Sequence, residues 1–480
     1  MCLVATAARS ISVDRWHVAA APSSCCFGGA SSSTTASRLA FVPAAGEQLN
    51  HQFYNTRRKR TRIRGYDARI ILFGGSKTSS AEQDAWRAGI ISSKHSRGNC
   101  INLGELTEAD RQQLLRSLLV DAHLLGDDCM FGDEYVSQTL GRGFCNWVYK
   151  VTPTSSSLVG GDDSLCNAVV VKVFSDLAKM RVPDDILGSI DVLASGCRIG
   201  PTVIHRGSNG IVMEYIDGTV LTEKDVHGIA KDDNSPDDTK FGNGQILCEK
   251  IGAKLAQLHF TPIPADLPIA NEVDNMLWMT LDAMLGFVGN DGPIPEAVLE
   301  AGWTHDRLSQ EVQTMRQKLD ALELPQVLCH GDFKPSNIVL VNDSSGGGGV
   351  GGIVLIDYEL SGPGYRGFDF FKLFRTGDPS RQNGDNMAAF VRSYLRSTDK
   401  REKDASSTIG SARVEQVLAE MKLFEPLTWL EAGIFFLFAA KGDPTQTERW
   451  EKLALDRFSN FDASKGRFQA NLEQYFKAMS

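Results

Sequence analysis

The spacing of hydrophobic residues changes along the chain. Short runs rich in valine and isoleucine predict β-strands over Val136–Val151, Val169–Phe174 and Ile211–Ile216. Apolar residues later recur at helical spacing, most clearly over Ile246–His259 and Leu423–Ala440. Because strands come early and helices dominate later, we predict an α+β chain with a small β-rich N-lobe and a larger helical C-lobe.

Two shorter patterns complete this prediction. A helix is expected over Leu106–Leu125, where four leucines share one face: Leu114, Leu115, Leu118 and Leu119. A glycine-rich stretch over residues 342–352 separates two β-branched runs, Ile338–Val341 and Ile353–Ile356. That pattern predicts a β-hairpin with a long tip.

The first hundred residues differ in composition from the rest. They contain 14 Lys and Arg against 5 Asp and Glu, including the basic run Arg57–Arg60. An acid-poor, Ser- and Arg-containing beginning is typical of an organelle transit peptide, and a disordered tail or a nuclear address has the same composition. We therefore expect a disordered extension over residues 1–102, an N-lobe over 103–217 and a C-lobe over 218–480.

Charge and apolar run length exclude several classes of protein. Residues 101–480 hold 36 basic and 54 acidic residues, a balance that repels nucleic acid and favours a cationic substrate. The longest apolar run, Ile434–Ala440, has seven residues and is too short to span a membrane. The ten cysteines show no metal-site spacing and are expected to be reduced and buried. These features predict a cytoplasmic protein, unless the extension directs it to an organelle.

One motif carries the chemistry. The stretch Leu328–Asn337 reads LCHGDFKPSN, and Asp357 ends the second strand of the predicted hairpin. Phosphoryl transfer from ATP needs a carboxylate beside the attacking hydroxyl and oxygen ligands for magnesium on the phosphates. Asp332, Asn337 and Asp357 fit these three roles. The alternative, in which Asp332 caps a turn and Asp357 merely ends a strand, does not explain why the loop is followed by this hairpin.

These residues resemble those of the choline/ethanolamine kinase family, within the wider aminoglycoside-phosphotransferase and protein-kinase-like group. The resemblance lies in Val327–Leu340 and in Leu355–Phe374, where Tyr365–Asp369 reads YRGFD, and it extends over roughly residues 135–475. The family implies a two-lobed protein-kinase-like fold. Gly331 is a departure, because family members more often have Asn at this position.

The resemblance assigns roles to the catalytic residues. Asp332 matches the catalytic base, and His330 belongs to the same catalytic loop and braces it. Asn337 and Asp357 match the magnesium ligands, and Glu359 stands where the family has an acid near metal and substrate.

The nucleotide side is carried by five residues. Gly141, Gly143 and Asn146 match the family's small-residue turn, where backbone N–H groups approach phosphate, although an ordinary hairpin turn has the same glycines. Lys172 stands in an apolar strand, where kinases place the lysine that holds the α- and β-phosphates, or else it lies at an edge and reaches solvent. The adenine is expected to bind backbone just after Glu214.

Lys172 needs an acidic partner if it is buried. The next helix lacks the expected glutamate, and three aspartates are candidates: Asp184, Asp185 and Asp191. The sequence does not choose among them.

The family holds its cationic substrate with aromatic rings and an acid. Tyr358, Glu359 and Trp429 match such positions, although Trp429 could equally be a core residue. The family's second tryptophan, one helical turn further on, corresponds here to Ala432. This loss weakens the case for choline and leaves ethanolamine or a related amino alcohol open.

The sequence thus predicts a kinase that uses ATP and Mg²⁺ to phosphorylate choline, ethanolamine or a related amino alcohol, the first step of phospholipid head-group synthesis. Two alternatives remain: a kinase of another small alcohol, and a catalytically weak nucleotide-binding protein. No nucleic-acid partner and no membrane span are expected, and a homodimer is left open.

Overall fold

The structure is a computed structural model, and its described residues all belong to one compact unit, Phe73–Ser480. They comprise residues 108–126, 135–142, 145–154, 168–228, 244–290, 294–342, 351–399, 410–442 and 444–479. The predicted extension over residues 1–102 and the predicted phosphate-loop glycine Gly143 lie outside this part of the chain.

A five-stranded antiparallel sheet forms the N-lobe, in the order β1-β2-β3-β5-β4. The strands are β1 (Tyr135–Arg142), β2 (Asn146–Pro153), β3 (Val169–Phe174), β4 (Val203–Gly207) and β5 (Gly210–Glu214). The three predicted strand regions are therefore confirmed, and β1 and β2 divide the first of them into a hairpin.

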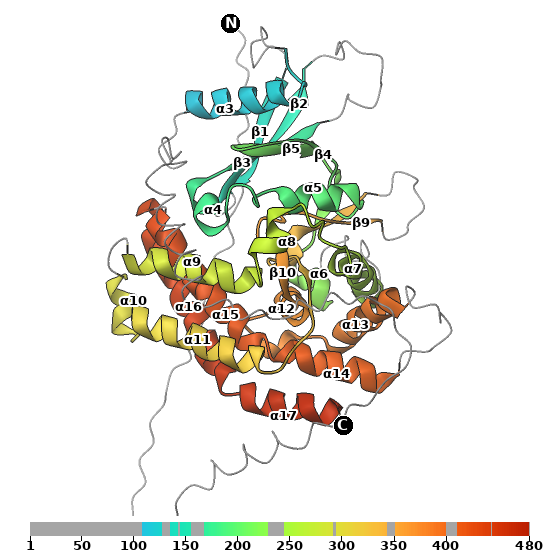
Figure 1. Cartoon of the computed structure of the whole chain (residues 1–480), viewed down its shortest axis with the longest axis vertical. Helices are drawn as coiled ribbons and strands as arrows, with labels where there is room; N and C mark the ends of the chain where they lie inside the picture. Colours follow the sequence, from blue (N-terminus) through green and yellow to red (C-terminus); the bar gives the residue numbers. More distant parts are fainter. Residues whose placement is uncertain are drawn as a thin grey trace, which may run out of the picture. The chain divides into compact units, whose positions relative to one another are not determined.

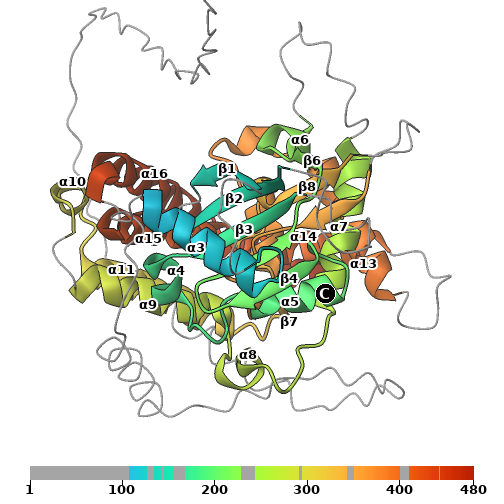
Figure 2. The ribbon, with the colours of Figure 1, turned by 90° about the horizontal axis from the view of Figure 1, so that it is seen from above.

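Helix α3 (Glu108–Asp121) packs on this sheet and confirms the predicted leucine face. Leu115, Leu118 and Leu119 are buried against strand residues such as Val171 and Val212. Figure 2 shows the helix lying across the strands. The short helices α4 (Asp176–Arg181) and α5 (Ser189–Gly196) follow β3 at the same end of the unit (Figure 1).

Helices make up most of the C-lobe (Figure 1). They are α6 (Glu223–His227), α7 (Gly244–His259), α8 (Pro268–Glu272), α9 (Met276–Asn290), α10 (Glu296–Glu300), α11 (His305–Asp320), α12 (Arg366–Leu373), α13 (Gly384–Asp399), α14 (Ser411–Lys422), α15 (Glu425–Gly442), α16 (Thr447–Lys465) and α17 (Phe468–Met479). The predicted helices at 246–259 and 423–440 correspond to α7 and α15. Helix α15 is apolar on nearly every side because α9, α11, α12 and α16 all pack on it.

Two small sheets hold the segments that carry the motif. Strands β6 (Gly218–Val220), β8 (Ile338–Val341) and β9 (Ile353–Leu355) form one, and β7 (Gln326–Cys329) pairs with β10 (Gly362–Tyr365) in the other. Ile338 lies opposite Leu355, so β8 and β9 form the predicted hairpin. The N-lobe sheet ends with β5 at Glu214, and the first strand of the small sheets, β6, begins at Gly218.

One helical stretch among the described residues is long and apolar enough to cross a membrane by length and composition. It is Ser411–Ala440, with a mean hydropathy of 1.4 in its most apolar window. Of that window 89% is buried inside the protein, as expected for a helix of the core.

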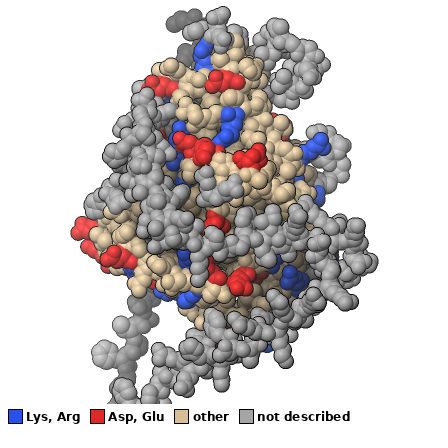
Figure 3. Space-filling model, viewed as in Figure 1, with Lys and Arg blue, Asp and Glu red and all other residues tan. Residues whose placement is uncertain are grey.

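The described cysteines agree with the sequence in most respects, and the surface carries charges of both signs. On the face drawn in Figure 3, acidic and basic side chains lie side by side. Cys145, Cys248 and Cys329 are free and buried as expected, whereas Cys197 is free but exposed at the end of α5.

Candidate active site

The catalytic loop connects β7 to β8 and requires glycine at its bend. Gly331 has a φ of 78°, and a Cβ atom there would lie 2.1 Å from the carbonyl oxygen of Leu360. Only glycine fits both the left-handed backbone and this close approach. The departure from the family pattern at Gly331 therefore has a steric reason in this chain.

Asp332 lies between two lysines. Its Oδ2 is 2.8 Å from Nζ of Lys334 and its Oδ1 is 2.9 Å from Nζ of Lys372. Nδ2 of Asn337 donates to the Asp332 backbone oxygen at 2.9 Å and to Oδ2 at 3.2 Å. Burial alone would raise the pKa of Asp332, but the two ammonium groups hold it well below its usual value. Asp332 is therefore a carboxylate at neutral pH.

Asp357 is brought to this loop by the hairpin. The backbone N–H of Ile356 donates to the carbonyl oxygen of Asn337 at 3.0 Å, and Nε2 of His330 donates to the carbonyl oxygen of Ile356 at 3.0 Å. Asp357 has a φ of 71°, a strained value for a non-glycine residue that is characteristic of functional sites. Asp332, Asn337 and Asp357 are thus held together by direct contacts between the loop and the end of β9.

His330 supports the loop and is not positioned for proton transfer. Its side chain is fully buried, and its Nδ1 has no partner among the described residues. Burial lowers the pKa of His330, so the ring is neutral and its Nε2 carries the proton given to Ile356. The contact matches the bracing role implied by the family resemblance.

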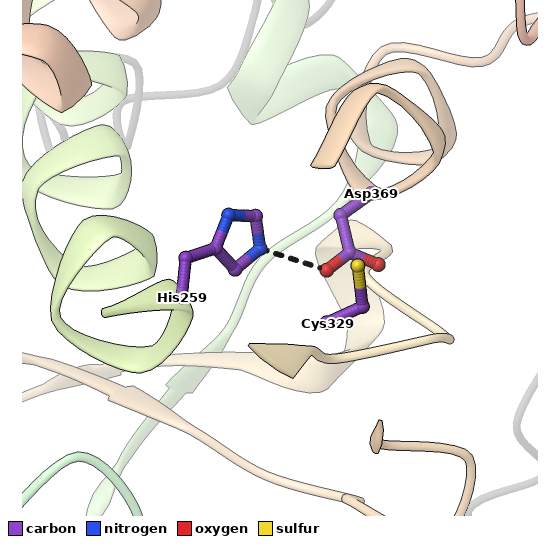
Figure 4. A group of neighbouring side chains, drawn as sticks. All are labelled: His259, Cys329 and Asp369. Atoms are coloured by element: carbon purple, nitrogen blue, oxygen red, sulfur yellow. Dashed lines mark hydrogen bonds and ion pairs between the residues drawn. The ribbon is translucent and has the colours of Figure 1, made fainter. Parts of the chain in front are cut away.

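A buried aspartate on α12 fixes the backbone of the same loop (Figure 4). Asp369 accepts hydrogen bonds from the backbone N–H of His330 at 2.7 Å and of Gly331 at 2.9 Å, and its Oδ2 is 3.0 Å from Nε2 of His259. The Cys329 sulfur lies beside them. Burial lowers the pKa of His259 and raises that of Cys329, so both are neutral. Both carboxylate oxygens of Asp369 are therefore occupied by hydrogen bonds, and Asp369 stabilises the catalytic loop.

A second cluster joins the N-lobe to Asp357. Nζ of Lys172 pairs with Asp357 and lies 3.1 Å from Oε2 of Glu359. Glu359 also accepts from Arg181 at 2.7 Å and from Nδ2 of Asn146, whose Oδ1 in turn accepts the N–H of Ser175. The structure therefore brings together around Glu359 three residues that were predicted to bind nucleotide or metal: Asn146, Lys172 and Asp357.

The partner of Lys172 differs from the expectation. Its ion pairs are with Asp357 and Glu359 in the C-lobe rather than with an acid on the next helix. Burial alone would lower the pKa of Lys172, but the surrounding carboxylates raise it above its usual value, so the side chain stays charged. The alternative of an edge-strand lysine in solvent is wrong, because β3 is the central strand and Lys172 is buried.

Asp191 is the candidate among the three aspartates that interacts with this cluster. It is buried on α5, while Asp184 and Asp185 are exposed. Burial raises the pKa of Asp191 to about 6, partly opposed by the attraction of Lys172. Glu359 behaves in the opposite way: burial disfavours its charge, but Lys172 and Arg181 lower its pKa to about 2.

Of the remaining residues predicted to bind the nucleotide, the structure describes Gly141 and Glu214. Gly141 pairs with Val148 next to an irregularity in the β1–β2 ladder. Glu214 ends β5, and its Oε1 accepts the backbone N–H of Thr202 at 2.8 Å. The side chain of Glu214 thus holds the strand end, and the adenine contact expected just after Glu214 stays a prediction.

In the described part of the chain, no hydrogen bond, ion pair or ring contact joins the side chains of the three predicted substrate residues. Tyr358 lies in the core, against the ring of His330 and close to Gly200, and its hydroxyl has no partner among the described residues. Glu359 belongs to the Lys172 cluster. Trp429 is buried on α15, where two arginine side chains approach its ring.

Sequence reasoning missed four charged residues of the site. Arg181 contacts Glu359, and Lys334 contacts Asp332. Lys372 pairs with both Asp332 and Glu431, and Glu431 is the fourth of these residues. Lys334 stands inside the motif itself and could have been named. Lys372 and Glu431 lie 59 residues apart on different helices, so no local pattern marks them.

The donor set fits magnesium. Nδ2 of Asn337 is committed to Asp332, which makes Oδ1 the atom free to act as a ligand. The side chain of Asp357 is 35% exposed, more than any other carboxylate around it. Two hard oxygen donors with access for water are what a magnesium ion on nucleotide phosphates requires.

The sheet-plus-helix fold and the grouping of Asp332, Asn337 and Asp357 define a protein-kinase-like phosphotransferase. The family model for choline/ethanolamine kinase matches residues 137–462. The chain belongs to the choline/ethanolamine kinase family and is a phosphotransferase with an alcohol group as acceptor.

Individual relatives are distant. The chain is 22% identical to the human choline/ethanolamine kinase over 56% of its own length and 70% of the relative, and 24% identical to mouse ethanolamine kinase 1 over 58% and 72%. Its fold is similar to that of an ethanolamine kinase from Plasmodium vivax, with a TM-score of 0.56 and 17% identity over 76% of this chain and 91% of the other. A choline kinase from Cryptosporidium parvum matches with a TM-score of 0.52 and 14% identity, over 76% and 100%.

Proposed function

We propose that this protein transfers the γ-phosphoryl group of Mg²⁺-bound ATP to the hydroxyl of a small acceptor. In this proposal the acceptor is an amino alcohol, the class of compound after which its family relatives are named. Phosphorylation of choline, ethanolamine or a related amino alcohol would be the first step of phospholipid head-group synthesis. The supporting observation is the cluster of Asp332, Asn337 and Asp357, fixed by the catalytic loop and the β8–β9 hairpin.

Asp332 orients the acceptor hydroxyl in this scheme. Its low pKa makes it a weak base, so it accepts the proton only as the bond to phosphorus forms, in keeping with the loose transition state of phosphoryl transfer. Lys334 and Lys372 hold both its oxygens and fix its direction. Asn337 and Asp357 would hold magnesium, which when bound neutralises charge on the phosphates.

Lys172 provides the cation for the nucleotide. It is buried among Asp357, Glu359 and Asp191, so a positive charge remains there even when Asp357 is engaged by metal. Arg181 and Asn146 keep Glu359 in place beside it. These contacts support the assignment of this cluster to the nucleotide and assign no role to the acceptor side.

The experiment is a substitution that removes only the orienting carboxylate. We expect Asp332→Asn to lower kcat by about 10²–10⁴-fold, because general acid–base catalysis typically contributes this much, while the affinity for Mg·ATP changes little. Turnover is measured by ADP release with a panel of acceptors, and ATP binding by calorimetry. A variant with the wild-type kcat contradicts the proposal.

The same chemistry on a different small alcohol is the second candidate function. It is favoured by one observation: two of the residues expected to hold a substrate cation, Glu359 and Trp429, already have cationic partners within the protein.

A further inference from the structure

Arg181 reaches from the N-lobe into the C-lobe. It is the last residue of α4, its side chain is 3% exposed, and α4 packs against α9 (Figures 1 and 2). Its Nη2 donates to Oε1 of Glu359 at 2.7 Å, and its Cζ lies 5.4 Å from the ring centroid of Phe435 on α15. An arginine of a short N-lobe helix is thus fixed between the segment that follows Asp357 and a helix of the C-lobe.

Glu359 holds this arginine in place. Its Oε1 accepts from Arg181, and its Oε2 lies 3.1 Å from Nζ of Lys172 and accepts from Nδ2 of Asn146. Both carboxylate oxygens of Glu359 are therefore engaged by N-lobe side chains. The acid of this segment that is open to a metal is Asp357, whose side chain is 35% exposed.

The guanidinium of Arg181 interacts with both sides of the proposed reaction. It interacts electrostatically with Cys145, in the turn between β1 and β2, and with the catalytic carboxylate of Asp332. That turn is expected to approach the phosphates of ATP, and Asp332 to approach the acceptor hydroxyl. Because the phosphoryl group passes from the one to the other during transfer, Arg181 stands beside its path.

Most donors of Arg181 have no acceptor in the described part of the chain. A guanidinium carries five N–H groups, and the hydrogen bond formed here is the one from Nη2 to Glu359, while Nε is buried without a partner. Burial alone would lower the pKa of Arg181, but the groups around it, Cys145 and Glu359 among them, raise it above its usual value. A buried cation with unused donors is destabilising until an anion binds beside it.

Lys172 is the other cation that Glu359 holds, and it is engaged differently. Its ammonium group pairs with Asp357 as well as Glu359, and it lies on β3 within the sheet that carries the predicted nucleotide contacts. Arg181 keeps free donors and interacts with Asp332. The two cations are therefore suited to different phosphates, Lys172 to those that remain on ADP and Arg181 to the one that is transferred.

We infer that Arg181 is a further catalytic residue, which binds oxygens of the γ-phosphoryl group as this group moves from ADP to the acceptor. The inference rests on the proposed function, because it adds a residue to that same transfer. The bond between the γ-phosphorus and the bridging oxygen of ADP breaks, the bond to the acceptor oxygen forms, and the acceptor's proton passes to Asp332. Arg181 exchanges no proton, and its planar guanidinium donates parallel hydrogen bonds to the phosphoryl oxygens.

Turnover by the full chain is the first test, with Mg·ATP and the amino alcohol on which the wild type is most active. We expect Arg181→Gln to lower kcat by at least about 10²-fold, since one preorganised donor to transition-state charge contributes about 10²–10³-fold. Arg181→Lys keeps the charge but loses the planar fork, so it should recover only part of this loss.

Lys179→Gln is the matched control for these variants. Lys179 lies on the same helix, and its Nζ donates to Oδ1 of Asn209 at 3.2 Å within the N-lobe. Its replacement removes a cation from α4 without touching Glu359 or Asp332. The kcat of Lys179→Gln should therefore equal that of the wild type.

Binding of a transition-state analogue separates a catalytic role of Arg181 from a structural one. Aluminium fluoride beside Mg·ADP mimics the phosphoryl group in transfer, and calorimetry measures ADP affinity with and without it, in the presence of the acceptor. We expect aluminium fluoride to tighten ADP binding to the wild type at least about 10-fold, since such analogues bind more tightly than ground-state ligands. Arg181→Gln should lose this gain and keep its affinity for Mg·ADP alone.

A purely structural role gives a different result. If Arg181 only held Glu359, its replacement would weaken Mg·ADP binding equally with and without aluminium fluoride. A gain that persists in Arg181→Gln, or that is absent from the wild type, would overturn the inference.

The remaining outcomes separate this inference from the proposed function. Thermal unfolding shows whether each variant is folded, and if Arg181→Gln is not, Arg181→Lys carries both tests because it keeps a cation beside Glu359. A folded variant of Arg181 with the kcat of the wild type overturns the inference and leaves the proposed function intact. Failure of the wild type to turn over any acceptor, with Mg·ATP bound, overturns the proposed function itself.

Discussion

The two sides of the site are built differently. The nucleotide-side cluster consists of Asn146, Lys172, Arg181, Asp357 and Glu359, and each cation there has a carboxylate partner. The acceptor-side cluster consists of Asp332, Lys372, Arg375, Trp429 and Glu431, and one cation there has none. In the first cluster every cation is paired directly with a carboxylate, whereas in the second Arg375 contacts the Trp429 ring and the backbone oxygen of Thr428.

This difference separates the chemistry from its specificity. In the proposed function the nucleotide-side residues bind the triphosphate and the metal that phosphoryl transfer requires, whichever acceptor is used. The acceptor differs from one member to another, and the residues that face it vary accordingly.

Among the groups that hold Asp332 in place, the largest expected effect comes from Lys372. Lys372→Met leaves Glu431 buried without a partner and frees one oxygen of Asp332, so we expect kcat to fall about 10²-fold because the catalytic carboxylate is misplaced. KM for ATP should stay within about twofold, since Lys172 and its partners are untouched. Steady-state kinetics in ATP and acceptor separate the two constants.

Stability is the control for this substitution. An unpaired buried carboxylate costs about 3–5 kcal/mol, and the double variant Lys372→Met/Glu431→Leu should recover most of that loss without recovering kcat. Lys452→Met, at an exposed position on α16, should change neither quantity. Full activity in the folded single variant would show that Lys372 does not position Asp332.

A smaller effect is expected from Asp191 on the nucleotide side. Its pKa is about 6 in the folded protein, above the usual 3.8, because burial disfavours the charge. The folded state therefore holds this proton more tightly than the unfolded state, and the associated stability is present below pH 4 and is lost as the pH rises through 6. Asp191→Asn removes this loss, which is on the order of 2–3 kcal/mol.

Thermal or urea unfolding at pH 4 and at pH 7 measures this pH-dependent contribution of Asp191 to the free energy of unfolding. The stability of Asp191→Asn relative to wild type should increase between the two pH values, whereas exposed Asp185→Asn should follow wild type at both. A constant difference across this range would mean that Asp191 does not titrate there.

The parts of the site that local sequence encodes were the parts that could be predicted. Asp332 and Asn337 lie five residues apart on one loop, and the hairpin that returns Asp357 is visible in its β-branched runs. Lys172 was recognisable because a single cation in an apolar strand is costly to bury unless it is paired. The strands, α3, α7 and α15 followed from hydrophobic spacing for the same local reason.

The remainder depends on backbone direction and on distant contacts. The backbone of Asp357 is left-handed, and the next residue, Tyr358, lies in the core beside Gly200. A linear motif does not reveal this change of backbone direction. The pairing of Lys172 with the C-lobe, and that of Lys372 with Glu431, arises only when separate segments pack together. Acceptor specificity was therefore the least predictable property of this chain.

The dependence of turnover on magnesium tests the central claim most directly. With the full chain, ATP and the preferred acceptor, ADP release and phosphorylated acceptor are measured while magnesium is titrated, in wild type and in Asp357→Asn. The account predicts equal amounts of the two products, loss of turnover on chelation, and a fall of at least about 10²-fold in Asp357→Asn that added magnesium does not fully reverse. Turnover that persists without magnesium, or ADP release without a phosphorylated acceptor, would contradict it.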